Sequence, residues 1–116
     1  MKESLIQGAI VDFLRAVLPK THRCVAIPNG SRRTAGGRAA NAVPGLTPGV
    51  QDLMVISAGR VWFIEVKTAR GKLSDAQEEW AAWCASTGTP YCIARSLDDV
   101  KVALNHWQIP TREAKQ

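Results

Sequence analysis

The chain has 116 residues, of which 46% are apolar, so it can bury one hydrophobic core but is short for two domains. No apolar run reaches the roughly eighteen residues of a membrane span, and the N-terminus lacks a signal-peptide layout, so we expect a cytoplasmic protein without a membrane segment. The formal net charge of +5, from 15 basic and 10 acidic side chains, permits a polyanionic partner without requiring one.

The first half of the chain predicts a helix, a strand, a long loop and a pair of strands. Apolar residues recur with helical spacing over residues 3–18, and Pro19 ends that helix. Residues 24–27 form a short run typical of a strand. Residues 29–49 are rich in Gly, Pro, Ala and Arg and have no period, so they predict a basic loop that is either mobile or functional. Residues 51–56 and 60–67 read as strands on either side of a turn.

The second half predicts a helix, a strand and a last helix. Ser74 and Gln77 have the spacing of a capping box, which begins a helix that residues 88–90 end. We expect its buried face at Ala76, Trp80, Trp83 and Cys84. Residues 91–94 predict a strand, Ser96 caps a helix to about residue 107, and residues 108–116 form a polar tail. The order αβββαβ(α) predicts one α/β domain over residues 1–116, with helices flanking a small mixed sheet.

Cysteine and histidine do not suggest a metal site. Cys24, Cys84 and Cys92 are odd in number, lack a CxxC spacing and lie among apolar residues, so we expect buried free thiols. His22 and His106 have no further ligand at useful spacing.

The two central strands bring acidic residues together. If Ala58 and Gly59 form a two-residue turn, Asp52 lies opposite Glu65, with the Cβ atoms roughly 4.5–5.5 Å apart. Two carboxylates at that distance repel each other unless a proton or a cation intervenes. Oxygen ligands suit a hard cation such as Mg²⁺, and Lys67 would follow on the same side of the strand, as metal-assisted phosphodiester hydrolysis requires.

Other interpretations remain open at this stage. Ala58 is poorly suited to a positive φ, and a three-residue turn with Gly59 as a bulge would shift the pairing by one residue. Asp52 could simply begin a strand, and Glu65 and Lys67 could form an exposed pair at a strand end. The capping box by itself accounts for Gln77. The arginines of residues 29–49 suit either a solvated loop or contacts to a phosphate backbone.

The chain resembles a known nuclease family. The runs PGVQDLMVI (48–56) and FIEVKTARGKLSDAQ (63–77), with IPNG (27–30) and GLTPG (45–49) before them, resemble the VRR-NUC (virus-type replication-repair nuclease) branch of the PD-(D/E)xK nucleases. The resemblance covers roughly residues 3–105 and implies a restriction-endonuclease-like core. One departure is visible, because Gln51 stands where the motif has proline.

The resemblance also assigns roles to individual residues. It implies a catalytic set and a metal-binding set that uses Mg²⁺ or Mn²⁺. The catalytic set is Asp52, Glu65, Lys67 and Gln77. The metal ligands are Asp52, Glu65, the backbone carbonyl of Val66, and Glu3. In a nuclease of this kind the two basic loops would contact the sugar–phosphate backbone of DNA, through Asn29, Arg32, Arg33, Arg38, Arg70 and Lys72.

The function implied by the resemblance is a metal-dependent endonuclease that hydrolyses phosphodiester bonds in DNA. Small members of this branch resemble junction-resolving enzymes of phage or mobile elements, which act in recombination and repair as homodimers on branched DNA such as Holliday junctions. Two alternatives stay open: a nicking or restriction-like nuclease on ordinary duplex, and a catalytically inactive module that binds nucleic acid.

Overall fold

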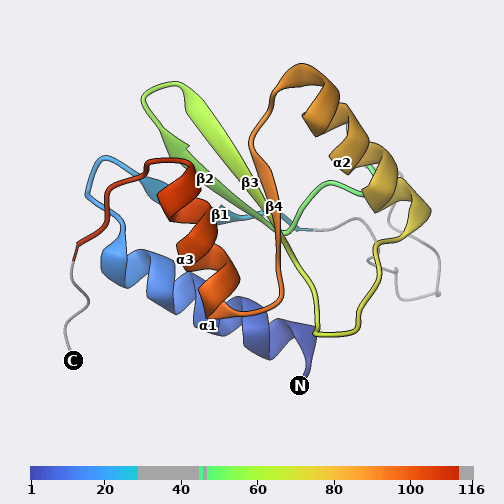
Figure 1. Ribbon diagram of the computed structural model, residues 1–116, viewed down its shortest axis with the longest axis horizontal. Coiled ribbons are helices and arrows are strands. Elements are labelled where there is room, and N and C mark those ends of the chain that lie inside the picture. The colour runs from blue at the N-terminus through green and yellow to red at the C-terminus, as the bar shows by residue number, and fades with distance from the viewer. Residues whose placement is uncertain (29–44, 46, 113–116) are drawn as a thin grey trace.

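The computed structural model describes residues 1–28, 45 and 47–112. Its elements are α1 (Glu3–Val17), β1 (Arg23–Ala26), β2 (Leu53–Ser57), β3 (Arg60–Val66), α2 (Asp75–Thr87), β4 (Tyr91–Ala94) and α3 (Leu97–His106) (Figure 1). The strands form one sheet in the order β1-β2-β3-β4, antiparallel between the first three and parallel between β3 and β4. The predicted α/β class and order of elements are therefore confirmed.

The β2–β3 hairpin has the register predicted from a two-residue turn. Ser57 pairs with Arg60, and the turn residues Ala58 and Gly59 have φ of 49° and 78°. Two consecutive positive φ values are typical of a type I′ turn, whose twist matches that of the two strands. Ala58 therefore adopts the conformation that its side chain disfavours, and the alternative of a shifted pairing is excluded.

β2 begins at Leu53, two residues later than predicted. The carboxylate of Asp52 accepts a hydrogen bond from the backbone amide of Val66, which an extended ladder would have paired with a carbonyl. The side chain of Asp52, the residue before β2, thus takes the place of a backbone carbonyl as the acceptor for Val66. On the other side of β2, the backbone carbonyl of Asp52 accepts from the amide of Ile27.

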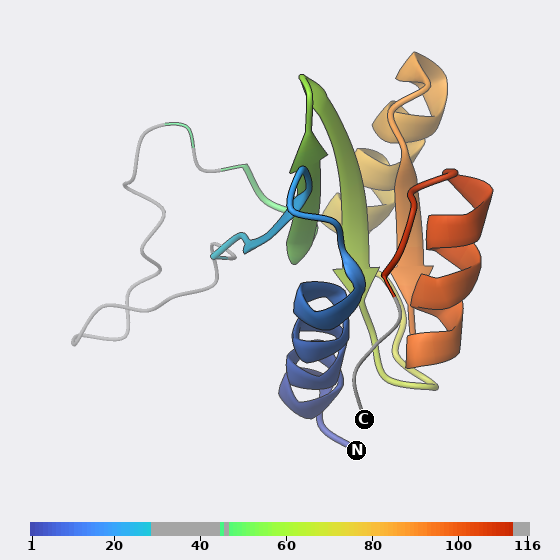
Figure 2. The same ribbon diagram turned by 90° about the vertical axis from the view of Figure 1, so that its left-hand side faces the viewer.

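The core lies on one face of the sheet, beneath α1 and α3. Alternate residues of β2 and β3 point toward it, including Leu53, Ile64 and Val66, each fully buried. α1 contributes Ile10 and Leu14 to the same cluster. Figure 1 shows α1 and α3 lying together, and Figure 2 shows α3 running beside β4.

α2 lies on the opposite face, where Trp80 contacts Phe63 at a ring-centroid distance of 5.8 Å. The expected buried face of this helix is only partly correct. Cys84 is buried, Ala76 and Trp80 are half-buried, but Trp83 is 50% exposed and stacks on Trp80 rather than entering the core. Helical spacing alone could not show that Cys84 is covered while Trp83, on the same side of the helix, stays half-exposed.

The first turn of α2 is fixed by its own cap and by the segment that precedes β2. Ser74 and Gln77 form the predicted capping box, and Gly88 ends the helix in the left-handed conformation. Gly49, with φ of 85°, lies so close to this turn that a Cβ atom there would be 2.8 Å from the amide of Gln77 and nearer still to the carbonyl of Ala76. A glycine is therefore required at this contact.

The three cysteines are free thiols as expected, but two of them are less buried than expected. Cys24, Cys84 and Cys92 are free, but only Cys84 is fully buried, and the other two are half-buried. Burial raises the pKa of all three thiols, that of Cys92 to about 12, so they are poor nucleophiles. None of the described helices has the length and apolar character of a membrane span.

Candidate functional site

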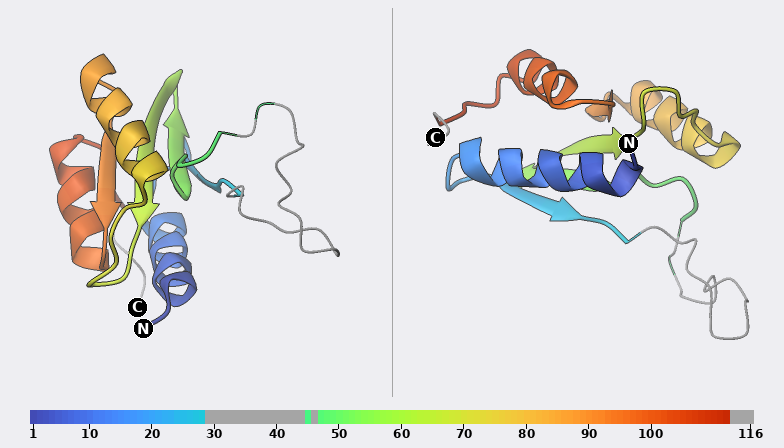
Figure 3. Two further views of the ribbon diagram at one scale, coloured as in Figure 1. Left: turned by 90° about the vertical axis from the view of Figure 1, so that its right-hand side faces the viewer. Right: turned by 90° about the horizontal axis from the view of Figure 1, so that it is seen from below.

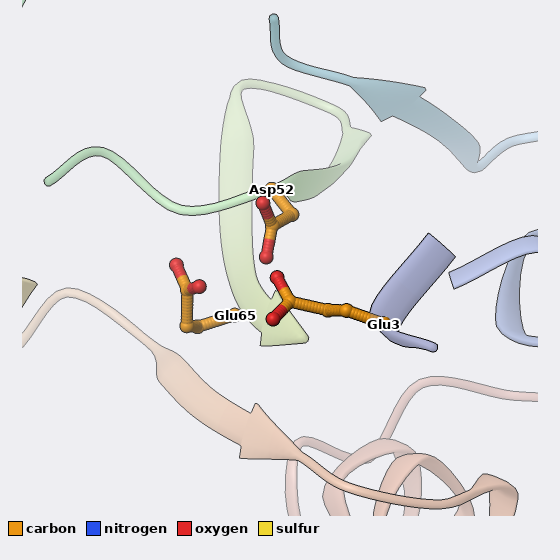
Figure 4. A group of neighbouring side chains, drawn as sticks. All are labelled: Glu3, Asp52 and Glu65. Carbon is orange, nitrogen blue, oxygen red and sulfur yellow. The ribbon is translucent and has the colours of Figure 1, made fainter. Parts of the chain in front are cut away.

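Three carboxylates from separate parts of the chain meet at the end of β3. Glu3 comes from the first turn of α1, Asp52 from the residue before β2, and Glu65 from the penultimate residue of β3. One carboxylate oxygen from each lies within 4.8 Å of the others (Figure 4). In the right-hand view of Figure 3 the N-terminus of α1 lies next to the end of β3, which brings Glu3 near the other two acids.

Asp52 is held in place by the sheet itself. Its Oδ2 accepts from the amide of Val66 at 2.8 Å, so the carboxylate bridges the ends of β2 and β3. The side chain is only 6% exposed. A buried carboxylate that accepts from a backbone donor is fixed in direction, so Asp52 presents its carboxylate at a defined point beside Glu65.

Glu65 is fully buried, and its two oxygens have different surroundings. Oε2 accepts from Nε2 of Gln77 at 3.2 Å and lies 3.9 Å from Nζ of Lys67. Oε1 is buried and receives no hydrogen bond from a donor group of another described residue. A buried acceptor without a donor is costly, and a cation bound among the three acids would satisfy it.

The electrostatics of the site also favour a cation. Burial is the largest cause that raises the pKa of Glu65, and Asp52 raises it further, both as a hydrogen-bond partner and as a negative charge. The ammonium of Lys67 lowers this pKa and the carboxylate of Glu3 raises it, and the result is a pKa of about 9. Glu65 without a cation therefore keeps a proton at neutral pH, and a divalent ion must displace that proton when it binds.

Gln77 serves the helix cap and the acidic site at the same time. Its Oε1 accepts from the amide of Ser74 at 2.9 Å, which closes the capping box, while its Nε2 donates to Glu65. The capping box is therefore confirmed, and Gln77 also contacts Glu65, while its catalytic role stays a prediction. A single amide has an acceptor and a donor, so the two contacts do not compete.

The oxygen-only ligand set fits a hard divalent cation. Mg²⁺ takes carboxylate and water oxygens and is usually held by one or two protein carboxylates, a requirement that Asp52 and Glu65 can meet, with Glu3 as a third. The ammonium of Lys67, 9% exposed and next to Glu65, is placed to contact a phosphate oxygen or a water molecule there. The arrangement can bring a cation, a water and an anionic ester together.

The residues predicted to contact DNA are divided by the structure. Arg70 and Lys72 are exposed in the connection between β3 and α2, directly after Lys67. The other four, Asn29, Arg32, Arg33 and Arg38, lie outside the described residues. The role of the Val66 carbonyl as a metal ligand stays a prediction, and the amide of the same residue donates to Asp52.

Sequence reasoning missed two residues that support the site. Gln51 is fully buried, and its Oε1 accepts from the indole nitrogen of Trp80 at 2.7 Å, which ties α2 to the segment carrying Asp52. Arg95, just after β4, donates through Nη1 to the carbonyls of Thr68 and Gly71, each at 2.7 Å. Gln51 was noticed in the sequence only as a departure from the proline of the family motif, and no local pattern indicates the contacts of Arg95.

Comparison with known proteins agrees with the geometry. A sequence model of the VRR-NUC domain matches residues 13–98, which is most of the chain and includes Asp52, Glu65, Lys67 and Gln77. Glu3 lies outside the matched residues, so its place in the site depends on the structure alone. No curated protein and no solved structure matches significantly. The chain belongs to the VRR-NUC family and carries a nuclease-type domain.

Proposed function

We propose that the protein is a divalent-metal-dependent DNA endonuclease. The observation that carries this proposal is the meeting of Glu3, Asp52 and Glu65 within 4.8 Å, beside the ammonium of Lys67, in a VRR-NUC domain. Three acids so close together are unfavourable without a cation. When bound, Mg²⁺ or Mn²⁺ would neutralise the scissile phosphate and acidify a water molecule.

The residues around the cation have distinct tasks in this reaction. Asp52 and Glu65 hold the ion, and the carbonyl of Val66 and the carboxylate of Glu3 complete its protein ligands. Lys67 orients the attacking water and offsets the negative charge that develops on the phosphate. Gln77 keeps the carboxylate of Glu65 in one orientation through the bond to its Oε2.

Branched DNA is the substrate class that we propose. α2, the helix whose first turn borders the acids, contains three acidic side chains and no Lys or Arg, so it is unsuited to reading bases in a groove. Arg70 and Lys72 are exposed near the site and suit contacts to the sugar–phosphate backbone. These features favour recognition of DNA shape over sequence, as at a four-way junction.

A homodimer follows from the same proposal. One active centre cuts one strand, so symmetric cutting of a four-way junction requires two centres related by a two-fold axis. Sedimentation equilibrium with and without junction DNA tests this point. A protein that cuts both strands while it remains monomeric would contradict the dimer but not the chemistry.

A cleavage assay tests the function directly. Purified protein is incubated with a labelled four-way junction or a linear duplex of the same length, in Mg²⁺, Mn²⁺ or EDTA. We expect cleavage of the junction with either metal and none in EDTA. Preferred cutting of the linear duplex would instead indicate a nicking or restriction-like enzyme, and binding without cutting under any divalent ion would indicate an inactive module.

Two variants separate the roles of the site residues. Lys67→Ala should bind DNA and metal but cut at least about a hundredfold more slowly, because it removes charge stabilisation of the transition state. Asp52→Asn should weaken metal binding, measured by calorimetry with Mn²⁺, and abolish cutting. Full activity of Asp52→Asn at saturating metal would refute the proposed site.

A further inference from the structure

A cleft lined by basic side chains lies at the far end of α1 from the three acids. Its volume is about 320 Å³, and four cationic residues line it: Arg15, Lys20, Arg23 and Arg112. No acidic residue is among its lining residues in the described part of the chain. We call this feature the basic cleft.

Two separate parts of the chain build the basic cleft, residues 14–24 and the segment that contains Arg112. Arg15 lies in the last turn of α1, Lys20 in the connection that follows, and Arg23 at the first position of β1. Arg112 comes from the C-terminal segment, where its amide donates to the carbonyl of Val17 at 2.6 Å and its Nε donates to that of Leu18 at 3.1 Å. Figure 1 shows this segment returning toward the C-terminal end of α1.

The cations of the cleft are not neutralised by the described protein. The ion pairs among the described residues are Lys67 with Glu65 and Lys101 with Asp98, so none involves the cleft. A basic residue at position 15 is partly explained by the negative end of the α1 dipole. A basic residue at position 112 is partly explained by its hydrogen bond to the carbonyl of Leu18. Neither explains Lys20 and Arg23, whose charges add to a repulsion that a bound anion would relieve.

The distance between the three acids and the basic cleft indicates which anion could reach both of them. Arg15 follows Glu3 by twelve residues of continuous helix, which corresponds to about 18 Å along α1. Duplex DNA rises about 3.4 Å per base pair, so the cleft lies about five base pairs from the acids. We propose that the basic cleft binds the phosphate backbone of the DNA substrate at this distance from the scissile bond, an inference that rests on the proposed nuclease function.

One residue on the same helix opposes this contact and so provides a control of opposite sign. Asp12 is exposed and lies one turn before Arg15, on the side of α1 that continues toward the cleft. Its carboxylate would repel a phosphate held by Arg15. Replacement by asparagine should therefore strengthen DNA binding, whereas loss of a structural role would weaken it or leave it unchanged.

The test measures DNA binding by fluorescence anisotropy in EDTA, so that it does not depend on cleavage. The double variant Arg15→Gln/Arg23→Gln of the full chain is compared with the wild type on a labelled four-way junction across a salt series. Each lost phosphate contact should reduce the slope of log K against log salt by about 0.9 and weaken binding about eightfold at 0.1 M salt. Asp12→Asn should change the affinity in the opposite direction.

Lys101→Gln is the control for a charge lost outside the cleft: it removes one positive charge, against two in the double variant, from an exposed residue that pairs with Asp98. It should leave the salt slope unchanged. Circular dichroism and thermal melting establish that each variant is folded. Shortening the junction arm that reaches the cleft below about five base pairs should abolish the difference between the wild type and the double variant.

The outcomes distinguish this proposal from the proposed function. If the wild type binds and cuts junction DNA but the double variant behaves like Lys101→Gln, the basic cleft is not a DNA site and the nuclease proposal survives. If inorganic phosphate displaces DNA from the wild type more than chloride of equal ionic strength, and not from the double variant, the cleft is a free-phosphate site, which also overturns the proposal. If the wild type binds no DNA at low salt, both proposals fail.

Discussion

Substitution of Gly49 by alanine should destabilise the protein and disturb the acidic site from a distance. Gly49 has φ of 85° and lies against the first turn of α2, at the carbonyl of Ala76 and the amide of Gln77. A methyl group at this position cannot be accommodated unless α2 or the segment before Asp52 moves. Either movement separates Gln77 from Glu65, which are now 3.2 Å apart.

The size of the effect has two parts. A non-glycine residue in the left-handed region costs about 1–2 kcal/mol. Forcing a methyl group into packed backbone adds about 1–3 kcal/mol. Gly59→Ala supplies the first part alone, because Gly59 has φ of 78° and an added Cβ there meets nothing within 4 Å.

Urea unfolding followed by tryptophan fluorescence measures both variants, and the cleavage assay measures their activity. We expect Gly49→Ala to lose about 1–3 kcal/mol more than Gly59→Ala in the free energy of unfolding, and to be the only one of the two with impaired cutting. Equal losses, or full activity of Gly49→Ala, would show that the contact between Gly49 and α2 does not constrain the site.

Four further predictions concern the groups that support the site. Gln51→Leu should cost about 1–3 kcal/mol in urea unfolding, because it leaves the indole nitrogen of Trp80 without its acceptor. Arg95→Ala should loosen the connection between β3 and α2, which faster limited proteolysis of that connection would reveal. Gln77→Glu should keep the helix cap and the thermal stability in Mg²⁺ but slow cutting, since a carboxylate cannot donate to Glu65. The last prediction concerns the raised pKa of Glu65 in EDTA, where the native state holds a proton that the unfolded chain loses above pH 4.5. The free energy of unfolding measured in urea should therefore fall as pH rises from about 5 to about 9. Glu65→Gln should remove that part of the decline.

The sequence was sufficient for the parts of the fold that depend on local rules. The cap at Ser74 and the stop at Gly88 follow from short-range backbone chemistry. The turn at Ala58 and Gly59 was one of two alternatives, because Ala58 disfavours the positive φ that it adopts. Once the turn is known, the register of the hairpin is fixed, and strand geometry then places Asp52 directly across from Glu65.

Long-range contacts were the parts that local rules could not supply. Trp83 was expected in the core because helical spacing shows which residues share a face but not which of them the rest of the chain covers. The contacts of Arg95 join the end of β4 to carbonyls about 25 residues earlier in the chain, and nothing in either segment indicates the other. The place of Glu3 was implied by family resemblance alone, and only the packing of α1 on the sheet brings its carboxylate to Asp52.

The capping box of α2 shows how a local rule and the site can select one residue together. Either glutamate or glutamine at the third helical position would accept from the amide of Ser74, so the helix alone does not distinguish them. The neighbouring group does, because Oε2 of Glu65 accepts from Nε2 of Gln77, and a glutamate there would offer no donor and would add a fourth acidic side chain to the three that already meet. Glutamine satisfies the cap with its oxygen and the acid with its nitrogen. The start of α2 and the orientation of the metal-binding acid are therefore fixed by the same side chain, so a change that frays this helix end also disturbs the acidic site.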